Sequence, residues 1–370
     1  MGFHSQGLDL ASTLTMYRNV PFSNFAPPSA GPSFSLAKLT RDGGLPTFTA
    51  SAFSNLLEML QVPFFRTEDV STGPALGFIG GGGFAKVTYD EIKTQDPTKP
   101  VSVAIKALSP ITPPLCDMDI PSTTISQAFC EICIMKHPNL LEHPNILKFI
   151  GLKWGDDRII GSSNSLQLSL LTEYADLGSL DSYLQFGLKM DWKIKLDVLN
   201  DITSGLHALH QCDIVHNDVK SANVFLFSRC ESHERIFAKV GDFGCSVPLA
   251  MKDGTRGPAG SQVFAPPEAY SSDCPVLPSR DVYSFGLIIL HIATESRPPF
   301  LEMTVEDAWE TKADAGAMAR FVKAWLPPSS APFIAQRAAM RALRLQPEER
   351  LNLNDITALW KDEYSSFTYY

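Results

Sequence analysis

One short polar stretch, flanked by apolar residues on both sides, carries three kinds of group suited to phosphate chemistry. Within residues 214–226, the six positions from Asp218 to Asn223 contain a carboxylate, an ammonium group at Lys220 and a side-chain amide. The apolar flanks predict strands or loop edges that hold a short polar loop against a core. Such a loop can present a carboxylate as proton acceptor, an ammonium as phosphate partner and an amide oxygen as metal ligand.

A second carboxylate and a glycine run add to this set. Asp242 follows Val240 and Gly241 and precedes Phe243 and a hinge-like Gly244. Four consecutive glycines occupy positions 80–83. Without side chains, the backbone of such a run can lie close over an anionic ligand and offer its N–H groups, although a run of glycines also fits a flexible turn.

A lysine and a glutamate between these motifs form a candidate pair. Residues 101–108 predict a strand with Val103 and Ile105 on one face and Ala104 and Lys106 on the other. A lysine beside an alanine on an inward face suits a phosphate partner below an adenine; the alternative is an edge-strand lysine that faces water. Residues 126–135 predict a helix with Glu131 on its inward side, where it can pair with Lys106; the alternative is a solvated glutamate.

In this order, the motifs resemble those of the protein kinase family. Residues 216–223 resemble its His-Arg-Asp…Asn catalytic loop, with Asn217 in the place of the arginine, and residues 242–244 match its Asp-Phe-Gly. Residues 79–87 resemble its glycine-rich loop, with Ala85 in the third glycine position. The likeness spans about residues 73–365. It includes Glu268 in a Pro-Pro-Glu sequence, which the resemblance pairs with the late Arg350. It also includes Asp281 of a buried helix predicted from residue 280, which by the resemblance braces the catalytic loop.

The resemblance implies a role for each candidate residue. Lys106, held by Glu131, would bind the α and β phosphates of ATP, and Asp218 would accept the proton of the attacking hydroxyl. Lys220 would reach the transferred phosphate as a point charge. Asn223 and Asp242 supply hard oxygen ligands that suit Mg²⁺ better than zinc. The expected nucleotide-binding set is completed by Ile79, Gly80, Gly81, Gly82, Gly83, Val87, Ala104, Thr172, Glu173 and Ala175.

The implied fold is an α+β, two-lobed protein kinase fold. A small β-rich N-lobe is expected over about 73–173 and a larger helical C-lobe over about 174–370, with the hinge near Glu173. The catalytic-loop motif that contains Asn217 and the strand that carries Lys106 would thus lie in different lobes. Residues 1–72 are expected to be an N-terminal extension, partly disordered or docked on the domain, with one helix over 50–60. The pattern indicates no function for this extension.

The composition and net charge of the chain argue against some classes of binding partner. The chain has 370 residues, 44% hydrophobic and 19% charged, which is typical of a globular protein. A formal net charge of −9 argues against nucleic acid as a partner, and the longest apolar stretch, 285–293, is too short to span a membrane. Cys130 and Cys133 have the spacing of a zinc or redox pair, but no second pair accompanies them, and reduced thiols in a cytoplasmic protein are expected.

The expected function is ATP-dependent phosphoryl transfer to serine or threonine hydroxyls of a protein substrate. A lysine at position 220 is similar to the serine/threonine kinases. Two alternatives stay open. One is a pseudokinase or scaffold that binds nucleotide without transfer, which Ala85 and Asn217 favour. The other is a small-molecule phosphotransferase of kinase-like fold, although such enzymes usually lack the Asp-Phe-Gly and Pro-Glu motifs.

Overall fold

The structure is a computed structural model of the chain. It describes residues 57–66, 69–70, 77–82, 85–92, 100–108, 122–156, 166–228, 236–249, 261–270, 274–295, 297–327, 329 and 331–367. These residues form two compact units. The N-terminal unit contains the described residues up to Leu141 together with Lys148–Tyr174, and the C-terminal unit contains Glu142–Leu147 and the chain from Ala175. Gly83, most of the helix predicted over 50–60 and the segments 109–121, 229–235 and 250–260 lie outside the described residues.

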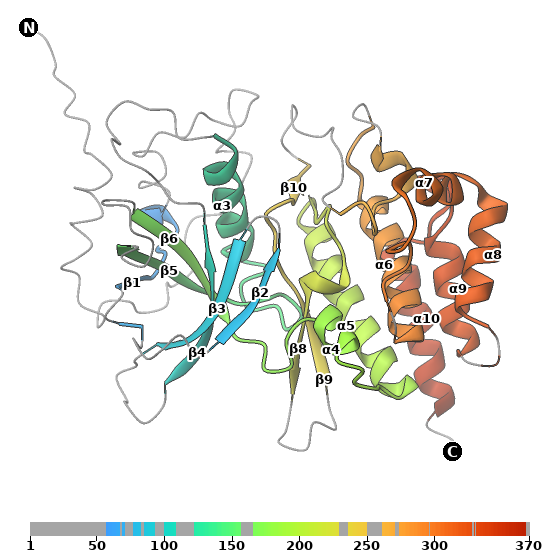
Figure 1. The fold of residues 1–370 in the computed structure, drawn as a ribbon, viewed down its shortest axis with the longest axis horizontal. Helices are drawn as coiled ribbons and strands as arrows, with labels where there is room; N and C mark the ends of the chain where they lie inside the picture. Colours follow the sequence, from blue (N-terminus) through green and yellow to red (C-terminus); the bar gives the residue numbers. More distant parts are fainter. Residues whose placement is uncertain are drawn as a thin grey trace, which may run out of the picture. The chain divides into compact units, whose positions relative to one another are not determined.

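The N-terminal unit is built on one sheet with a helix beside it (Figure 1). Among the described residues the sheet has six strands in the order β1-β5-β6-β4-β3-β2. Only the β1–β5 pairing is parallel within this described sheet. The strands are β1 (Phe64–Arg66), β2 (Gly77–Gly82), β3 (Ala85–Ile92), β4 (Val101–Ala107), β5 (Phe149–Asp156) and β6 (Leu166–Glu173), and the helix is α3 (Ser122–Met135).

Alternation along β4 separates the two faces of this sheet, as the sequence predicts. Val103 and Ile105 are buried in a cluster with Phe65, Val70, Ile92 and Leu171. Ala104 and Lys106 therefore point to the other face, because successive side chains of a strand alternate. Phe65 and Val70 precede residue 73, so part of the segment before the predicted domain packs on the sheet.

Helix α3 begins earlier than the pattern predicts. Its first residue is Ser122 rather than Ser126. Ser122 and the two threonines that follow have low helix propensity, and no apolar periodicity marks the first turn. The buried residues of its second half, among them Ile132 and Ile134, fix the face that packs.

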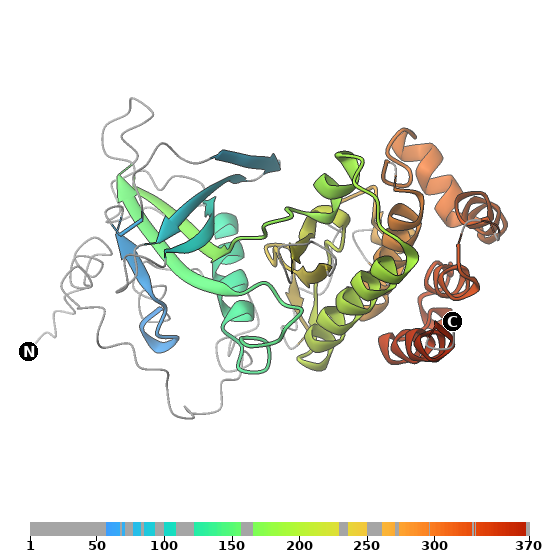
Figure 2. The same ribbon diagram turned by 90° about the horizontal axis from the view of Figure 1, so that it is seen from below.

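The C-terminal unit is mainly helical, with two small antiparallel ribbons (Figure 2). Its helices are α4 (Leu180–Gln185), α5 (Trp192–Gln211), α6 (Pro278–Thr294), α7 (Val305–Ala313), α8 (Ala315–Trp325), α9 (Phe333–Ala342) and α10 (Leu353–Phe367), with the 3₁₀ turns η4 (Ser221–Asn223), η5 (Pro267–Tyr270) and η6 (Pro347–Glu349). Strand β7 (Ile214–Val215) pairs with β10 (Val247–Pro248), and β8 (Val224–Ser228) pairs with β9 (Ile236–Val240). Along α5, the buried Leu199, Ile202, Leu206 and Leu209 recur at spacings of three and four residues, which is typical of a helix with one packed face.

Helix α6 is the centre of this unit. Every residue from Arg280 to Ile292 is buried, as its nearly continuous apolar sequence predicts. Gly286 allows close packing, because a Cβ there would lie 2.9 Å from the Cβ of Ala342 on α9. On the neighbouring helices, the indole N–H of the fully buried Trp360 donates to Thr203 Oγ1 at 3.1 Å and ties α10 to α5. None of the described helices combines the length and the apolar character needed to span a bilayer.

Candidate functional site

The N-terminal unit holds a buried carboxylate against the predicted lysine. The Nζ of Lys106 on β4 lies 3.1 Å and 3.0 Å from the two carboxylate oxygens of Glu131 on α3. The Glu131 side chain is 5% exposed and the Lys106 side chain 24% exposed. The predicted pairing is therefore confirmed. It fixes the ammonium group over the face of the sheet that carries Ala104, while its partial exposure leaves room for an anionic ligand.

Four of the expected nucleotide-binding residues lie on adjacent strands of this unit. Val87 on β3 is opposite Lys106, and Ala104 on β4 is opposite Thr172 on β6. The Glu173 carboxylate accepts a hydrogen bond from the Lys148 N–H at 2.7 Å, and its own N–H donates to the Lys148 carbonyl. The strand register and these hydrogen bonds place the four residues on neighbouring strands. Contact between these residues and the adenine of ATP stays a prediction.

The three described glycines of the run, Gly80 to Gly82, form the end of a strand rather than a free turn. Ile79, Gly80, Gly81 and Gly82 belong to β2, which pairs with β3 after an irregularity between Phe78 and Gly80. Ala85 begins β3 in extended backbone, opposite Gly82. Ala175, expected in the same nucleotide set, is in the C-terminal unit and is buried with Leu147 and Phe227.

The Cys130–Cys133 pair lies on α3 beside Glu131. Burial, with the neighbouring Glu131 carboxylate, raises the pKa of the Cys130 thiol to about 12. Burial also raises the pKa of Cys133, and the Cys130 side chain adds to the effect. Both thiols are therefore protonated at neutral pH, the form typical of buried reduced cysteines.

In the C-terminal unit, Asp218 is held by one oxygen and presents the other. Its Oδ2 accepts hydrogen bonds from Lys220 Nζ at 2.7 Å and from Asn223 Nδ2 at 3.1 Å. The same amide also donates to the Asp218 backbone carbonyl at 2.9 Å, which closes the loop on itself. Oδ1 is buried and has no hydrogen-bond partner among the described residues. The carboxylate is thus oriented through Oδ2, while the buried Oδ1 keeps its capacity to accept a hydrogen bond.

Helix α6 holds the backbone of this loop. The two oxygens of the buried Asp281 accept the N–H groups of His216 and Asn217, each at 2.8 Å, and Oδ2 also lies 2.8 Å from His210 Nε2. The predicted bracing of the loop by Asp281 is confirmed. It matters because Asn217 has a positive φ of 60°, an uncommon conformation that needs such support.

A further anchor was not predicted. The Oγ of Ser221, in the same loop, lies 2.7 Å from Nδ1 of His291, and both side chains are fully buried. The signal in the sequence is a histidine inside the apolar stretch 285–293, where a polar side chain needs a partner.

Asn223 and Asp242 come from segments that the backbone joins. The N–H of Gly241 donates to the Asn223 carbonyl at 3.0 Å, and Nε2 of His216 lies 3.1 Å from the Gly241 carbonyl. Phe243 is fully buried with its ring 5.5 Å from that of His216. Asp242 has a φ of 61°, a second positive φ at a non-glycine residue. Because the Asn223 amide nitrogen faces Asp218, its Oδ1 is turned away and accepts no hydrogen bond from the described residues. An amide oxygen and a carboxylate are a donor set that fits Mg²⁺.

A family model described as the protein kinase domain matches residues 75–364. The chain belongs to the protein kinase family. The predicted α+β, two-lobed kinase fold is confirmed, with a sheet-based N-terminal lobe and a helical C-terminal lobe.

The chain is similar to several protein kinases, among them two that are described as serine/threonine-protein kinases. From Arabidopsis thaliana, the LRR receptor-like serine/threonine-protein kinase RGI2 is 26% identical over 317 residues, which are 80% of this chain and 25% of that protein. The serine/threonine-protein kinase PBL13 is 28% identical over 310 residues, 77% of this chain and 56% of that protein. Mitogen-activated protein kinase kinase kinase 13-A of Xenopus laevis is 31% identical over 164 residues, 44% of this chain and 15% of that protein. The chain thus covers between about a seventh and just over half of these relatives.

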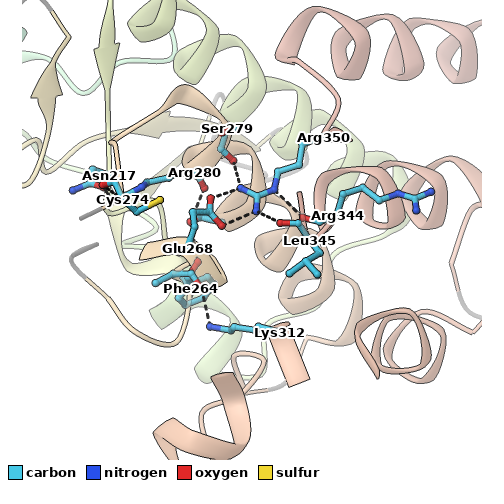
Figure 3. Close-up of polar contacts among 12 residues, drawn as sticks. Asn217, Phe264, Glu268, Cys274, Ser279, Arg280, Lys312, Arg344, Leu345 and Arg350 are labelled. Atoms are coloured by element: carbon cyan, nitrogen blue, oxygen red, sulfur yellow. Dashed lines mark hydrogen bonds and ion pairs between the residues drawn. The ribbon is translucent and has the colours of Figure 1, made fainter. Parts of the chain in front are cut away.

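Two buried basic side chains, Arg350 and Lys312, make polar contacts within the C-terminal lobe (Figure 3). Arg350 donates to both carboxylate oxygens of Glu268, at 2.6 Å and 2.8 Å, so that predicted pair is confirmed. Lys312 on α7 donates to the backbone carbonyls of Gln262, Val263 and Ala265 at 2.9–3.0 Å. The sequence does not mark Lys312 as buried, because a lysine among charged helix neighbours is typical of a solvated face.

A third cation stands beside the residue that departs from the family pattern. Asn217 replaces the arginine of the catalytic loop. Nη1 of Arg280, on α6, lies 3.3 Å from Asn217 Oδ1, and Nη2 donates to the Cys274 carbonyl at 2.9 Å. Figure 3 shows the Arg280 side chain directed toward Asn217 and Cys274. A guanidinium group therefore lies next to this loop position, supplied by a different element.

Proposed function

We propose that this chain is an active protein kinase that transfers the γ-phosphoryl group of ATP to serine or threonine hydroxyls of a protein substrate. The observation that carries the proposal is the state of Asp218. Its Oδ2 is fixed by Lys220 and Asn223, while its buried Oδ1 has no partner among the described residues. An oriented carboxylate with one available oxygen is what a hydroxyl needs as proton acceptor during attack on phosphorus.

The remaining groups neutralise and position the phosphates. Lys106, oriented by Glu131, would bind the α and β phosphates of ATP, and Lys220 would contact the phosphoryl group in transfer. Asn223 and Asp242 would hold Mg²⁺, which when bound supplies positive charge to the phosphate oxygens. Phosphoryl transfer depends on positioning and charge more than on covalent chemistry, and these are the properties that the fixed side chains provide.

Two observations support serine or threonine as the acceptor in a protein. Lys220 stands in the loop position typical of serine/threonine kinases, and the two Arabidopsis relatives described above carry that description. The Asp-Phe-Gly sequence, the Glu268–Arg350 pair and Asp281 favour a protein substrate over a small molecule.

The test is transfer of labelled phosphate from ATP with Mg²⁺ to arrayed serine, threonine and tyrosine peptides. Asp218→Asn keeps the size of the side chain and is expected to lower kcat by at least about 100-fold. Asp355→Asn, an exposed aspartate of α10, is the matched control and is expected to leave the rate unchanged. Equal rates for wild type and Asp218→Asn would refute the role of Asp218.

The same experiment separates the alternatives. ATP binding without transfer to any peptide would indicate a pseudokinase, for which the Asn217 substitution is the structural argument. Transfer to aminoglycosides or choline, and not to peptides, would indicate a small-molecule phosphotransferase.

A further inference from the structure

An open groove lies between η5 and α7 in the C-terminal lobe. It has a volume of about 530 Å³, and six residues line it. They are Pro267 and Tyr270 of η5 and Val305, Glu306, Trp309 and Glu310 of α7. No residue of the groove belongs to the candidate site described above.

The groove and the chain just before it expose large apolar side chains. Trp309 and Val305 are each 45% exposed, and Leu301 and Met303 are exposed as well. A half-exposed tryptophan beside further exposed aliphatic residues is unusual for a surface that meets only water. Tryptophan and tyrosine at such a position are typical of an interface, because they offer a large rigid apolar area.

The groove is also acidic. Glu306 and Glu310 are exposed, stand one turn apart on α7, and form no ion pair with any described residue. Glu306 lies in the first turn of α7, where its charge interacts favourably with the helix dipole. Glu310 lies beyond the first turn, and its charge repels that of Glu306 at the i, i+4 spacing. By contrast, Glu302 is paired with Arg297. An unpaired acidic rim around an apolar centre complements a basic and apolar ligand.

The two walls of the groove are fixed to each other. Lys312, on α7, donates to the carbonyls of Gln262, Val263 and Ala265, and the chain leads from these residues directly into η5. Its Nζ also lies 3.5 Å from the hydroxyl of Tyr270, one of the lining residues. The groove is therefore preformed, which lowers the entropic cost of binding.

The same helix fixes the groove and the proton acceptor. On α6, Asp281 holds the backbone of the Asp218 loop, and Ser284 Oγ donates to the Phe264 carbonyl at 2.8 Å. A chain segment seated in the groove would therefore lie at a constant distance from Asp218. This geometry favours a substrate as the occupant, because a fixed second contact presents the acceptor hydroxyl at a raised effective concentration.

We propose that this η5–α7 groove is a docking site for a basic segment of the protein substrate that carries an apolar anchor residue. The anchor, a leucine or phenylalanine, packs against Trp309 and Tyr270, and arginine or lysine residues beside it pair with Glu306 and Glu310. The inference rests on the proposed function only in naming the occupant a substrate.

Binding is tested without nucleotide, by fluorescence anisotropy of the full chain with three labelled peptides. One peptide carries two arginines and a phenylalanine, the second has glutamates for the arginines, and the third has alanine for the phenylalanine. The first is expected to bind at least about tenfold more tightly than either of the others. Its affinity is expected to fall between about 50 mM and about 300 mM salt, because the rim charges are exposed.

Two kinds of variant locate the binding. Trp309→Ala is expected to weaken the first peptide about tenfold or more. Glu306→Lys with Glu310→Lys is expected to weaken it severalfold and to remove the salt dependence. The controls are Phe333→Ala, an aromatic side chain 74% exposed on α9, and Glu348→Lys with Glu349→Lys on η6. Both controls are expected to bind like wild type, and circular dichroism confirms that each variant is folded.

Several results would overturn the docking proposal. They are equal affinity for the three peptides, preference for the acidic peptide, or equal weakening by Trp309→Ala and Phe333→Ala. Self-association of the chain that Trp309→Ala abolishes, seen by analytical ultracentrifugation without peptide binding, would make a second copy the occupant.

A last measurement separates this proposal from the proposed function. The first peptide is joined by a glycine–serine linker to a serine acceptor, and transfer is compared with that to the acceptor alone. Docking predicts a lower KM for the joined peptide. Tight peptide binding with no transfer to either substrate would leave the groove intact and count against the kinase activity, whereas transfer with the same KM for both would count against the groove as a substrate site.

Discussion

Arg350 offers the sharpest test of what holds the C-terminal lobe together. Its side chain is fully buried and donates five hydrogen bonds. Two of them go to Glu268, and the other three go to the carbonyls of Ser279, Arg344 and Leu345. The guanidinium carbon also lies 4.8 Å from the centre of the Tyr283 ring. Arg350→Met keeps much of the apolar volume and removes every one of these polar contacts.

The expected loss of stability follows from the polar groups that Arg350→Met leaves without their partner. Glu268, with a side chain 14% exposed, loses its only described ionic partner and reaches water poorly. Removing one member of a buried ion pair costs about 3–5 kcal/mol. Three carbonyls lose a donor as well, but these terms overlap with the first and do not add in full. We therefore expect Arg350→Met to lower the free energy of unfolding by about 3–5 kcal/mol, a large part of the 5–15 kcal/mol of a typical domain.

The measurement is urea unfolding followed by tryptophan fluorescence, since Trp192, Trp325 and Trp360 report on this lobe. Arg344→Met, an exposed arginine six residues earlier, is the control and is expected to change stability by less than about 0.5 kcal/mol. A double-mutant cycle with Glu268→Gln then isolates the pair. A loss below about 1 kcal/mol for Arg350→Met, or a cycle with no coupling, would refute the reasoning.

Two further predictions concern the other buried cations. Burial lowers the pKa of Lys312 from 10.5 to about 7, so the unfolded chain binds more protons than the folded chain between these values. Stability contributed by this group therefore rises with pH across that window, by up to about 1.4 kcal/mol per unit. Urea unfolding at several pH values between 7 and 9 is expected to show a rise for wild type that Lys312→Met lacks, and parallel curves would contradict this. Asn217→Arg places a second guanidinium beside the buried Arg280 and is expected to destabilise the fold by at least about 2 kcal/mol, with partial recovery when Arg280→Ser is added. Thermal unfolding checks this, and a variant as stable as wild type would show that the two cations do not compete.

The motifs that chemistry requires were the part of the molecule that the sequence could predict. Phosphoryl transfer needs particular residue types in a particular order, so Asp218, Asn223 and Asp242 are recognisable without coordinates. The ion pair between Lys106 and Glu131 was also predictable, although 25 residues of sequence separate the two positions. This pairing could be predicted only with the family pattern, because a lysine or a glutamate alone does not differ in sequence from an ordinary surface charge.

What the sequence could not predict depends on tertiary context. Strand β1 has only three residues, too few to show alternation, and its parallel partner β5 is far along the chain. Lys312 stands in a helix with charged residues on both sides, and only the carbonyls of another segment explain its burial. Arg280 is in the first turn of α6, and an arginine is ordinarily expected to be exposed.

The polar residues of α6 explain why one apolar helix can organise this lobe. Arg280, Asp281, Ser284 and His291 fall within roughly 100° of the helix circumference at 3.6 residues per turn. Each contacts a different backbone or side-chain group: Arg280 and Asp281 hold the catalytic loop at its start, His291 holds it at Ser221, and Ser284 holds the chain at Phe264.

One face of α6 thus holds both the loop that contains Asp218 and the chain that leads to the η5–α7 groove. This arrangement gives a physical reason for the pairing of Asn217 with Arg280. The loop position needs a partner for its positive-φ backbone and its side chain, and α6 supplies both from adjacent residues. A guanidinium group fixed by a buried helix does not depend on a phosphate elsewhere in the chain for its orientation. The loss of the loop arginine is therefore compatible with an ordered catalytic loop.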